Sequence, residues 1–325
     1  MSRTTLVFVV LFAALVLSST YALLAGSITI ELWQLAGVLL GDETGLPQRV
    51  VLELRLPRAV AAFTVGALLA LAGVLLQVLL RNPLADPYIL GISGGAAAGA
   101  LGAMMLGAGR AVLSGGAILG ALVSMLLVFG IAHGRGSWSA TRLLLTGVVV
   151  AAGWAALVSF MLAVAPDANL RGMLFWLMGD LSYDAPYAWG IGMLTVGLLA
   201  SMLIARNLNI LARGDLQATA LGVNAKVLRV LIYVLASALC AIAVTIAGTI
   251  GFIGLVVPHM LRLIGVTDHR SLIPAAVLLG GSLLLSADTL ARTVIAPQQL
   301  PVGVLTALLG VPLFLVLLYH GARKN

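Results

Sequence analysis

The sequence predicts an all-α integral membrane protein with ten transmembrane helices. Of its 325 residues, 62% are hydrophobic and only 9% are charged. A soluble domain carries roughly a quarter charged residues and about half apolar ones, so this composition is typical of a chain that exposes apolar surface to lipid. The 37 glycines favour close packing of helices within the membrane.

Ten apolar segments approach the length of about 20 residues that a helix needs to cross a bilayer. In order, we expect them at 6–26, 57–80, 88–108, 111–132, 143–165, 186–205, 227–247, 250–266, 272–290 and 300–319. Together they form a single transmembrane domain over residues 1–325.

The first and the eighth segments differ from an ordinary span. A cleavable signal peptide is the alternative for 6–26, but its apolar run exceeds the roughly 7–15 residues of a signal sequence, which favours a retained helix. The segment 250–266 is short and contains Pro258, which predicts a bent or broken helix.

The basic residues predict the orientation, because cytoplasmic loops carry an excess of Lys and Arg. With the N-terminus in the cytoplasm, the cytoplasmic segments hold 12 basic and 3 acidic residues, and the other side holds 6 basic and 8 acidic residues. The 12 are Arg3, Arg81, Arg135, Arg142, Arg206, Arg213, Lys226, Arg229, Arg262, Arg270, Arg323 and Lys324. The balance of +9 against −2 places both termini in the cytoplasm and explains the net charge of +7 without nucleic-acid binding.

A short polar stretch, NILARGDLQATALGVNAKVLRV (209–230), interrupts the cytoplasmic side between the sixth and seventh spans. It predicts a small amphipathic helix with an apolar side of Leu216, Ala220, Leu221 and Val223. Such a side fits the groove of a partner protein, and the alternative is a helix that lies on the lipid surface. We expect Asp215 to be solvated or to cap the start of the helix.

Several familiar chemistries are not indicated by the sequence. It has no G-x-x-x-x-G-K-[ST] loop, so we expect no ATP hydrolysis and no cofactor bound by this chain. The stretch GTIGFIG (248–254) has the wrong spacing for a dinucleotide site, and no cluster of metal ligands occurs. The single cysteine, Cys240, lies in an apolar run and predicts a packed side chain.

The stretch GISGGAAAG (91–99) resembles a phosphate loop but begins a predicted span. Gly91, Gly95 and Gly99 recur every four residues, which places them on one helix face and predicts tight contact with a neighbouring helix.

The middles of the ten spans contain no Asp, Glu, Lys or Arg. Charged groups at membrane depth are typical of proton relays and ion-coupling sites, so their absence disfavours a secondary transporter driven by an ion gradient. It also disfavours an intramembrane enzyme. The pattern indicates a gated conduit whose energy comes from a partner; an ion-driven transporter and a structural membrane subunit stay open as alternatives.

Several motifs together resemble the FecCD-type permease family of bacterial ABC importers for iron–siderophore complexes, haem and cobalamin (vitamin B12). The segment 54–100 resembles the family's R-x-P-R helix start and its N-P-L-A-x-P-x-x-L-G-x-S-x-G-A signature. The segment 248–262, GTIGFIGLVVPHMLR, resembles the G-F-I-G-L-x-x-P-H-x-x-R signature, and 267–276 and 299–314 resemble the last two spans.

The resemblance implies the type II ABC importer architecture in the bacterial inner membrane, with the substrate path along the two-fold axis of a homodimer. Two ATP-binding cassette subunits, which use the ATP, dock from the cytoplasm. A periplasmic substrate-binding protein delivers the metal chelate, whose identity the sequence leaves open.

The resemblance also implies roles for particular residues. Residues 214–224 match the coupling helix that contacts the ATPase, with Gly214, Asp215, Leu216, Ala220, Leu221, Gly222 and Val223 as the coupling residues. Arg55, Arg58 and Arg292 match the arginines that receive glutamates of the binding protein; snorkelling to lipid headgroups is the alternative for Arg55 and Arg58. The region 170–186 matches the periplasmic gate, with Phe175, Trp176 and Met178 as gate residues; an interfacial aromatic belt is the alternative there.

Overall fold

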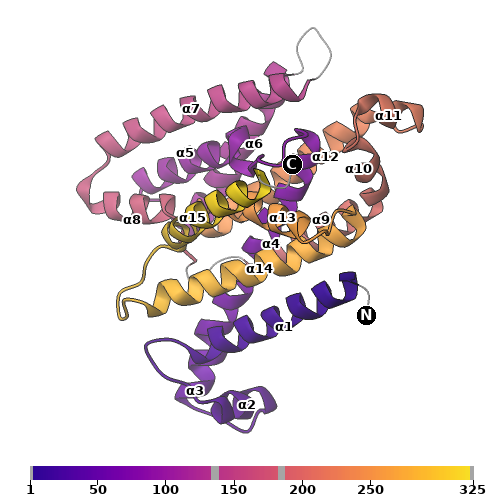
Figure 1. Cartoon of the computed structure of the whole chain (residues 1–325). Coiled ribbons are helices and arrows are strands. Elements are labelled where there is room, and N and C mark those ends of the chain that lie inside the picture. Colours follow the sequence, from indigo (N-terminus) through magenta and orange to yellow (C-terminus); the bar gives the residue numbers. More distant parts are fainter. Residues whose placement is uncertain (1–2, 133–138, 182–186, 323–325) are drawn as a thin grey trace.

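The computed structural model describes residues 3–132, 139–181 and 187–322, and every regular element in these ranges is a helix (Figure 1). The predicted all-α class is therefore confirmed. Each of the ten predicted spans coincides with an apolar helix. These are α1 (Arg3–Leu24), α4 (Leu56–Leu79), α5 (Ile92–Met105), α6 (Arg110–Ala132), α7 (Ala140–Val164), α9 (Tyr187–Leu203), α12 (Ala225–Ala247), α13 (Ile253–Leu263), α14 (His269–Thr293) and α15 (Val302–Ala322).

Not all of these helices have the length of a membrane span. By length and composition, six helical segments in the described ranges are able to cross a bilayer, and α9 with α10 (Ala205–Leu211), bent by 62°, adds a seventh. The helices α5, α13 and the Val302–Leu317 part of α15 are apolar but shorter. The crossing of the membrane by all ten segments and the cytoplasmic position of both termini therefore stay predictions.

Several short helices lie between the spans. A helical run of α3 (Leu46–Arg49) and the π-helix η1 (Val50–Arg55) leads directly into α4, and α2 (Leu32–Leu40) precedes it. The 3-10 helix η2 (Pro87–Leu90) leads into α5, and α8 (Asp167–Leu177) follows α7. The predicted polar helix is α11 (Asp215–Ala220).

The eighth span was expected to be bent or broken at Pro258, and the break is not observed, because α13 continues through Pro258. A proline inside a helix cannot donate to the carbonyl four residues earlier, which is that of Gly254. This carbonyl faces Gly73 of α4: a Cβ added to Gly73 lies 1.9 Å from the Gly254 oxygen. Packing of α13 against α4 and α14 holds the helix together where the local sequence disfavours it.

Helix α4 lies at the centre of the molecule (Figure 1). It packs against α14, α12, α13 and α9, and 89% of the apolar window in its helical run is buried, against 6% in the outer helix α7. A helix that is apolar on all faces is stable only when it is buried. Close approach depends on glycine: a Cβ on Gly66 lies 2.3 Å from the backbone oxygen of Gly280 in α14.

The contact between α5 and α6 has the same basis. A Cβ on Gly95 lies 2.3 Å from the oxygen of Gly120, and a Cβ on Gly99 lies 1.9 Å from the oxygen of Gly116, so both lie at the tight helix contact. Gly91 differs from the prediction because it precedes α5. It has a φ of 72° there, a left-handed conformation that closes η2.

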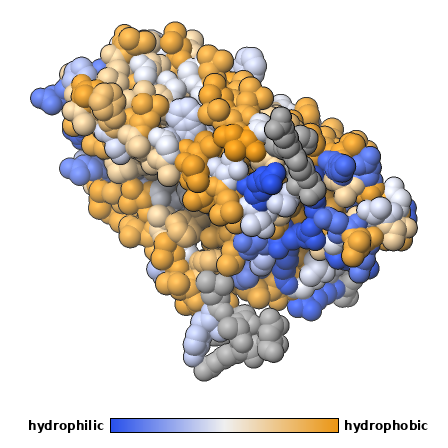
Figure 2. Space-filling model, turned by 90° about the horizontal axis from the view of Figure 1, so that it is seen from above, coloured by the Kyte–Doolittle hydropathy of each residue, from blue (hydrophilic) through white to orange (hydrophobic). Residues whose placement is uncertain are grey.

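The surface of the protein is largely hydrophobic, as expected for helices that face lipid. Figure 2 shows hydrophobic residues over much of the visible face, with hydrophilic residues gathered mainly toward one end. The outer helices α1, α6 and α7 expose many large apolar side chains, among them Leu17, Leu119 and Val149. Cys240 of α12 is buried in the hydrophobic core, as predicted.

Candidate functional site

A buried charged group lies where α4 begins and α14 ends, and we call Arg58, Asp288, Arg292 and Gln299 the Asp288 cluster. The Arg58 Nη2 atom lies 2.8 Å from Asp288 Oδ1, and Arg58 Nε lies 3.0 Å from Oδ2. Arg58 Nη1 donates to Gln299 Oε1 at 2.9 Å. Arg292 Nε lies 3.2 Å from Asp288 Oδ2, so a single carboxylate receives two guanidinium groups.

The charged members of the Asp288 cluster are closed to water in this structure, whereas Gln299 is exposed. The exposed fraction is 3% for Arg58, 6% for Arg292 and 0% for Asp288. A buried ion pair is retained only when its members are paired and hydrogen-bonded, and removal of one partner leaves an uncompensated charge. The cluster therefore ties α4 to α14 at this end of the molecule.

Arg55 is buried separately, at the end of η1. Its Nη1 atom donates to the backbone oxygens of Leu23 at 2.7 Å and Leu24 at 2.8 Å, and its Nη2 atom donates to the oxygen of Ile28. These carbonyls lie at and beyond the end of α1, where helix carbonyls lack partners within the helix. Arg55 thus caps α1 and fixes the segment that follows it.

The expectation for the three docking arginines therefore needs one correction. Arg55, Arg58 and Arg292 lie at the predicted end of the molecule but do not face water; each binds groups of this chain. Sequence reasoning placed Arg55 and Arg58 near the start of a helix. It missed Asp288, which comes 230 residues after Arg58. The role of the three arginines in docking stays a prediction.

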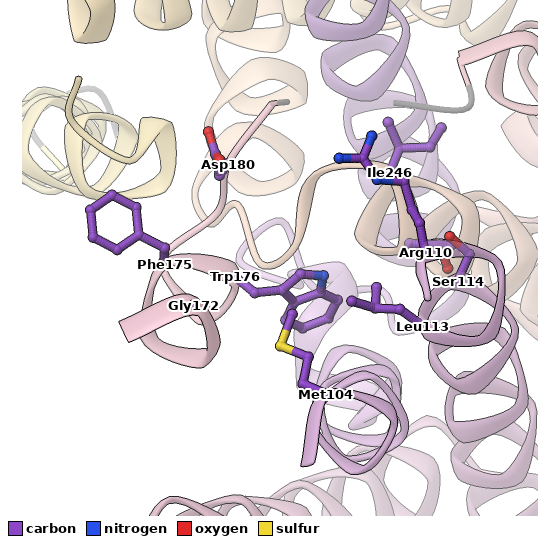
Figure 3. Close-up of a pocket in the computed structure, with 10 residues that line it drawn as sticks. Met104, Arg110, Leu113, Ser114, Gly172, Phe175, Trp176, Asp180 and Ile246 are labelled. Atoms are coloured by element: carbon purple, nitrogen blue, oxygen red, sulfur yellow. The ribbon is translucent and has the colours of Figure 1, made fainter. Parts of the chain in front are cut away.

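Two residues of the predicted gate, Phe175 and Trp176, lie in the last turn of α8, and the third, Met178, follows it. Trp176 lines a cavity of about 270 Å³ together with Met104, Leu113 and Arg110. Figure 3 shows the Trp176 ring between Met104 and Leu113; Phe175, which also lines the cavity, points to a different side of α8. The Arg171 guanidinium lies 5.6 Å from the centre of the Phe175 ring, a cation–π contact.

The end of α8 is held against the segment that follows α12. The hydroxyl of Thr249 donates to the oxygen of Leu177, and the N–H of Asp180 donates to the oxygen of Ala247 at 2.9 Å. Met178 caps α8, and a Cβ on Gly303 of α15 lies 2.2 Å from the Met178 oxygen. Movement of α8 is thus linked to α12 and α15, although the gating role itself stays a prediction.

Helix α11, unlike the buried arginines described above, is short and largely exposed. Its start has Gly214 at a φ of 120°, and its end has Gly222 at a φ of 77°, conformations that favour glycine. The N–H of Val223 donates to the oxygen of Ala218 at 2.9 Å, which closes the last turn as a Schellman motif.

The side chains of α11 face in two directions. Ala218 is fully buried, whereas Leu216 is 89% and Leu221 is 66% exposed. Ala220 is also exposed, and Val223 is half-buried. The two leucines thus offer apolar surface that no residue in the described part of the chain covers.

The expectation that Asp215 caps α11 is wrong, whereas its side chain is 41% exposed, in agreement with the solvated alternative. Gly214 occupies the cap position, and the Asp215 carboxylate pairs with Arg81 and Arg229, a group that we call the Asp215 cluster. Arg81 Nη2 lies 2.8 Å from Oδ2, and Arg229 Nη2 lies 2.5 Å from both carboxylate oxygens. Arg81 follows the end of α4, and Arg229 lies in α12. Sequence reasoning missed both partners; their only signal was a basic residue at each helix end.

Comparison with known proteins adds an independent finding. The model of the FecCD transport family matches residues 12–320. The vitamin B12 import system permease protein BtuC of Escherichia coli O127:H6 is 40% identical over 297 residues, which cover 90% of each chain. An uncharacterized ABC transporter permease protein, YvrB of Bacillus subtilis (strain 168), is 37% identical over 293 residues, which cover 87% of this chain and 82% of that one.

Solved structures show the same architecture. A metal-chelate type ABC transporter in an inward-facing conformation superimposes with a TM-score of 0.86 at 31% identity, covering 97% of this chain and 99% of that one. PsaBC from Streptococcus pneumoniae, solved in complex with Fab, superimposes with a TM-score of 0.56 at 19% identity, which shows a shared fold alone.

Proposed function

This chain belongs to the FecCD transport family of ABC transporter permeases, and from that premise we propose that it carries a metal chelate across the bacterial inner membrane into the cytoplasm. The observation that carries the proposal is the likeness, over almost the whole chain, to a metal-chelate type transporter. In the proposed assembly, two copies of the chain form a homodimer that binds two ATPase subunits and a periplasmic substrate-binding protein.

Cobalamin is the chelate that we propose first. Permeases of vitamin B12 import systems in Escherichia coli and Klebsiella pneumoniae are 40% and 41% identical to this chain over most of its length. Ferric siderophores and haem are the alternatives, because they are also metal chelates.

Helix α11 is the proposed contact with the ATPase. Its exposed Leu216 and Leu221 offer apolar surface to a groove, and its ends are fixed by Gly214 and Gly222. ATP-driven movement of the ATPase subunits then displaces α11 and changes which side of the substrate path is open.

The Asp288 cluster and Arg55 define the proposed contact with the substrate-binding protein. Because the three arginines are buried on partners in this chain, docking of acidic side chains requires some of these contacts to exchange. The approach of an acidic partner is favoured by the positive charge of two guanidiniums on one carboxylate.

Uptake by the reconstituted complex tests the function. The chain is placed in proteoliposomes with its ATPase and binding protein, and accumulation of labelled cobalamin, haem and a ferric siderophore is measured with and without ATP. We expect ATP-dependent uptake of cobalamin that survives collapse of ion gradients by ionophores. Uptake that ionophores abolish and that ATP does not drive would instead support the ion-gradient transporter.

A substitution on α11 tests the ATPase contact. We expect Leu216→Asp to abolish co-purification of the ATPase or to reduce ATP-dependent uptake. Burial of an ionised, unpaired carboxylate in an apolar groove weakens binding by several kcal/mol. The fold should be unaffected, since Leu216 is 89% exposed.

Leu106 provides the matched control, because it is 84% exposed and lies after the end of α5, away from α11. Leu106→Asp should retain wild-type amounts of ATPase and wild-type uptake. Equal behaviour of the two variants contradicts the assignment of α11 and favours a helix that rests on lipid.

A further inference from the structure

The Asp215 cluster joins three elements that are separate in the sequence. Asp215 is the first residue of α11, Arg81 lies two residues beyond α4, and Arg229 lies in the second turn of α12. Arg81 has a φ of 48°, a left-handed conformation that is uncommon for a residue with a side chain. The turn at the end of α4 is therefore shaped so that the Arg81 guanidinium reaches Asp215.

The two arginines connect α11 to two helices that are packed in the core of the molecule. Helix α4 packs against α14, α12, α13 and α9, and nearly all of its side chains are buried. Helix α12 packs against α4 and is itself 72% buried over its apolar window, and Arg229 is 9% exposed. A displacement of α11 that leaves these ion pairs intact must pull on the ends of both central helices.

We propose that Asp215 is a positioning residue that transmits movement of α11 to the end of α4 and the start of α12. The proposal rests on the proposed function, in which the ATPase moves α11. Asp215 itself does not contact the ATPase in this scheme; it acts through Arg81 and Arg229.

The Asp215 cluster is partly open to water, unlike the Asp288 cluster. The side chains of Asp215 and Arg81 are 41% and 40% exposed, so this ion pair contributes little to stability, whereas the Arg229 side chain is 11% exposed. A cavity of about 650 Å³ beside the cluster is lined by Asp215, Arg81, Arg229 and Lys226. The carboxylate is the one acidic group among these three cations, so its loss leaves them to repel one another.

The competing explanation is that α11 follows its neighbours through packing alone. Ala218 is fully buried and anchors α11 beside α10. If this contact is sufficient, removal of the Asp215 charge leaves transport unchanged. The two explanations therefore differ in one measurable quantity, the number of substrate molecules taken up per ATP hydrolysed.

The first experiment measures this ratio in proteoliposomes that contain the whole complex, with cobalamin as the probe. We expect Asp215→Asn to retain the ATPase and to reduce uptake per ATP by about 5- to 150-fold, the usual range for a lost coupling between sites. Asp215→Glu, which keeps the carboxylate, should recover most of the ratio. The double variant Asp215→Asn with Arg81→Gln should be no worse than Asp215→Asn alone, because both changes break the same link.

Asp268 supplies the matched control. It is an exposed aspartate at the same end of the molecule, and it accepts hydrogen bonds from Asn209 and the N–H of Arg270. Asp268→Asn should leave uptake per ATP unchanged. An unchanged ratio in Asp215→Asn overturns the proposal. Loss of the ATPase from the Asp215→Asn complex also overturns it, since Asp215 is then part of the docking surface.

The second experiment needs no partner and separates this inference from the proposed function. Spin labels are placed at Leu84→Cys and Leu221→Cys in a Cys240→Ser background, and labelled subunits are diluted with unlabelled ones. Both positions are exposed, one in the turn after α4 and one at the end of α11. We expect Asp215→Asn to broaden the distance distribution between the labels.

An unchanged distribution refutes the link, whatever the transport result. A broadened distribution in a chain whose wild-type complex takes up no metal chelate refutes the proposed function and leaves the link between α11 and α4 in place.

Discussion

Carboxylates that each bind two arginines stand at both ends of α4, a helix that is about 36 Å long. At one end, Asp288 is fully buried and binds Arg58 and Arg292. At the other end, Asp215 is 41% exposed and binds Arg81 and Arg229. Figure 1 places these ends on opposite sides of the molecule, the start of α4 beyond α3 and its end toward α11.

The difference between the clusters lies in water access, not in composition. An ion pair in a buried site is strongly coupled to the fold, because breaking it leaves a charge that water cannot solvate. An ion pair that water reaches can open and re-form with a small change in free energy. A carboxylate bound by two arginines can therefore hold helices rigidly together at the Asp288 cluster and allow them to move relative to one another at the Asp215 cluster.

The largest effect is expected for a substitution in the Asp288 cluster. We expect Asp288→Asn to destabilise the protein by about 3–5 kcal/mol, because two buried guanidiniums lose their counter-charge. Asp215→Asn should cost less, because water reaches Asp215 and Arg81, although the buried Arg229 also loses its counter-charge. Thermal unfolding of both variants in the same detergent measures the contrast, and similar losses of stability in the two would contradict the distinction.

An intermediate effect is expected at Asp268, which caps α14 on the same side as α11. Its carboxylate accepts from the N–H of Arg270 at 2.9 Å and from Asn209 Nδ2 at 2.7 Å. Removal of such a cap costs about 0.5–2 kcal/mol, so Asp268→Ala should fall between the two charged clusters in thermal unfolding.

The same residue gives a pH dependence with a defined sign. The bond from the N–H of Arg270, followed by that from Asn209, holds the pKa of Asp268 below its ordinary value. A group whose pKa is lower in the folded state stabilises the protein above its ordinary pKa of about 4 and loses this contribution as the pH falls. Asp268→Ala should therefore reduce stability at pH 7 more than at pH 3; an equal loss at both pH values argues against the carboxylate.

The smallest effect is expected at Arg81. We expect Arg81→Gln to change stability by about 0–1 kcal/mol and this change to diminish in high salt, because salt screens exposed charges. Arg58→Gln is the matched comparison at the other end of α4, where salt should have little influence. If the loss of stability caused by Arg81→Gln does not depend on salt, the ion pair of Arg81 is shielded from water. The proposal that the Asp215 cluster allows movement then fails.

Much of the architecture follows from the sequence alone. Long apolar runs form helices in lipid because a backbone without water must satisfy its own hydrogen bonds, and each predicted run coincides with a helix. The four-residue spacing of Gly95 and Gly99 identified a helix contact, because the spacing places both on one face. The segment 214–224 stood out because a polar stretch between apolar runs has to lie outside the membrane core, and the structure forms α11 there.

Only the tertiary structure decided which charges meet. Sequence position placed Arg58 at the start of a helix and Asp215 at the start of another, but pairing depends on chain segments that are 230 and 134 residues away. It also decided the continuity of α13 through Pro258, since the packing of Gly254 on Gly73 acts between helices. Local patterns determine helices and their faces; burial and ion pairing depend on which helices become neighbours, and that is a property of the whole fold.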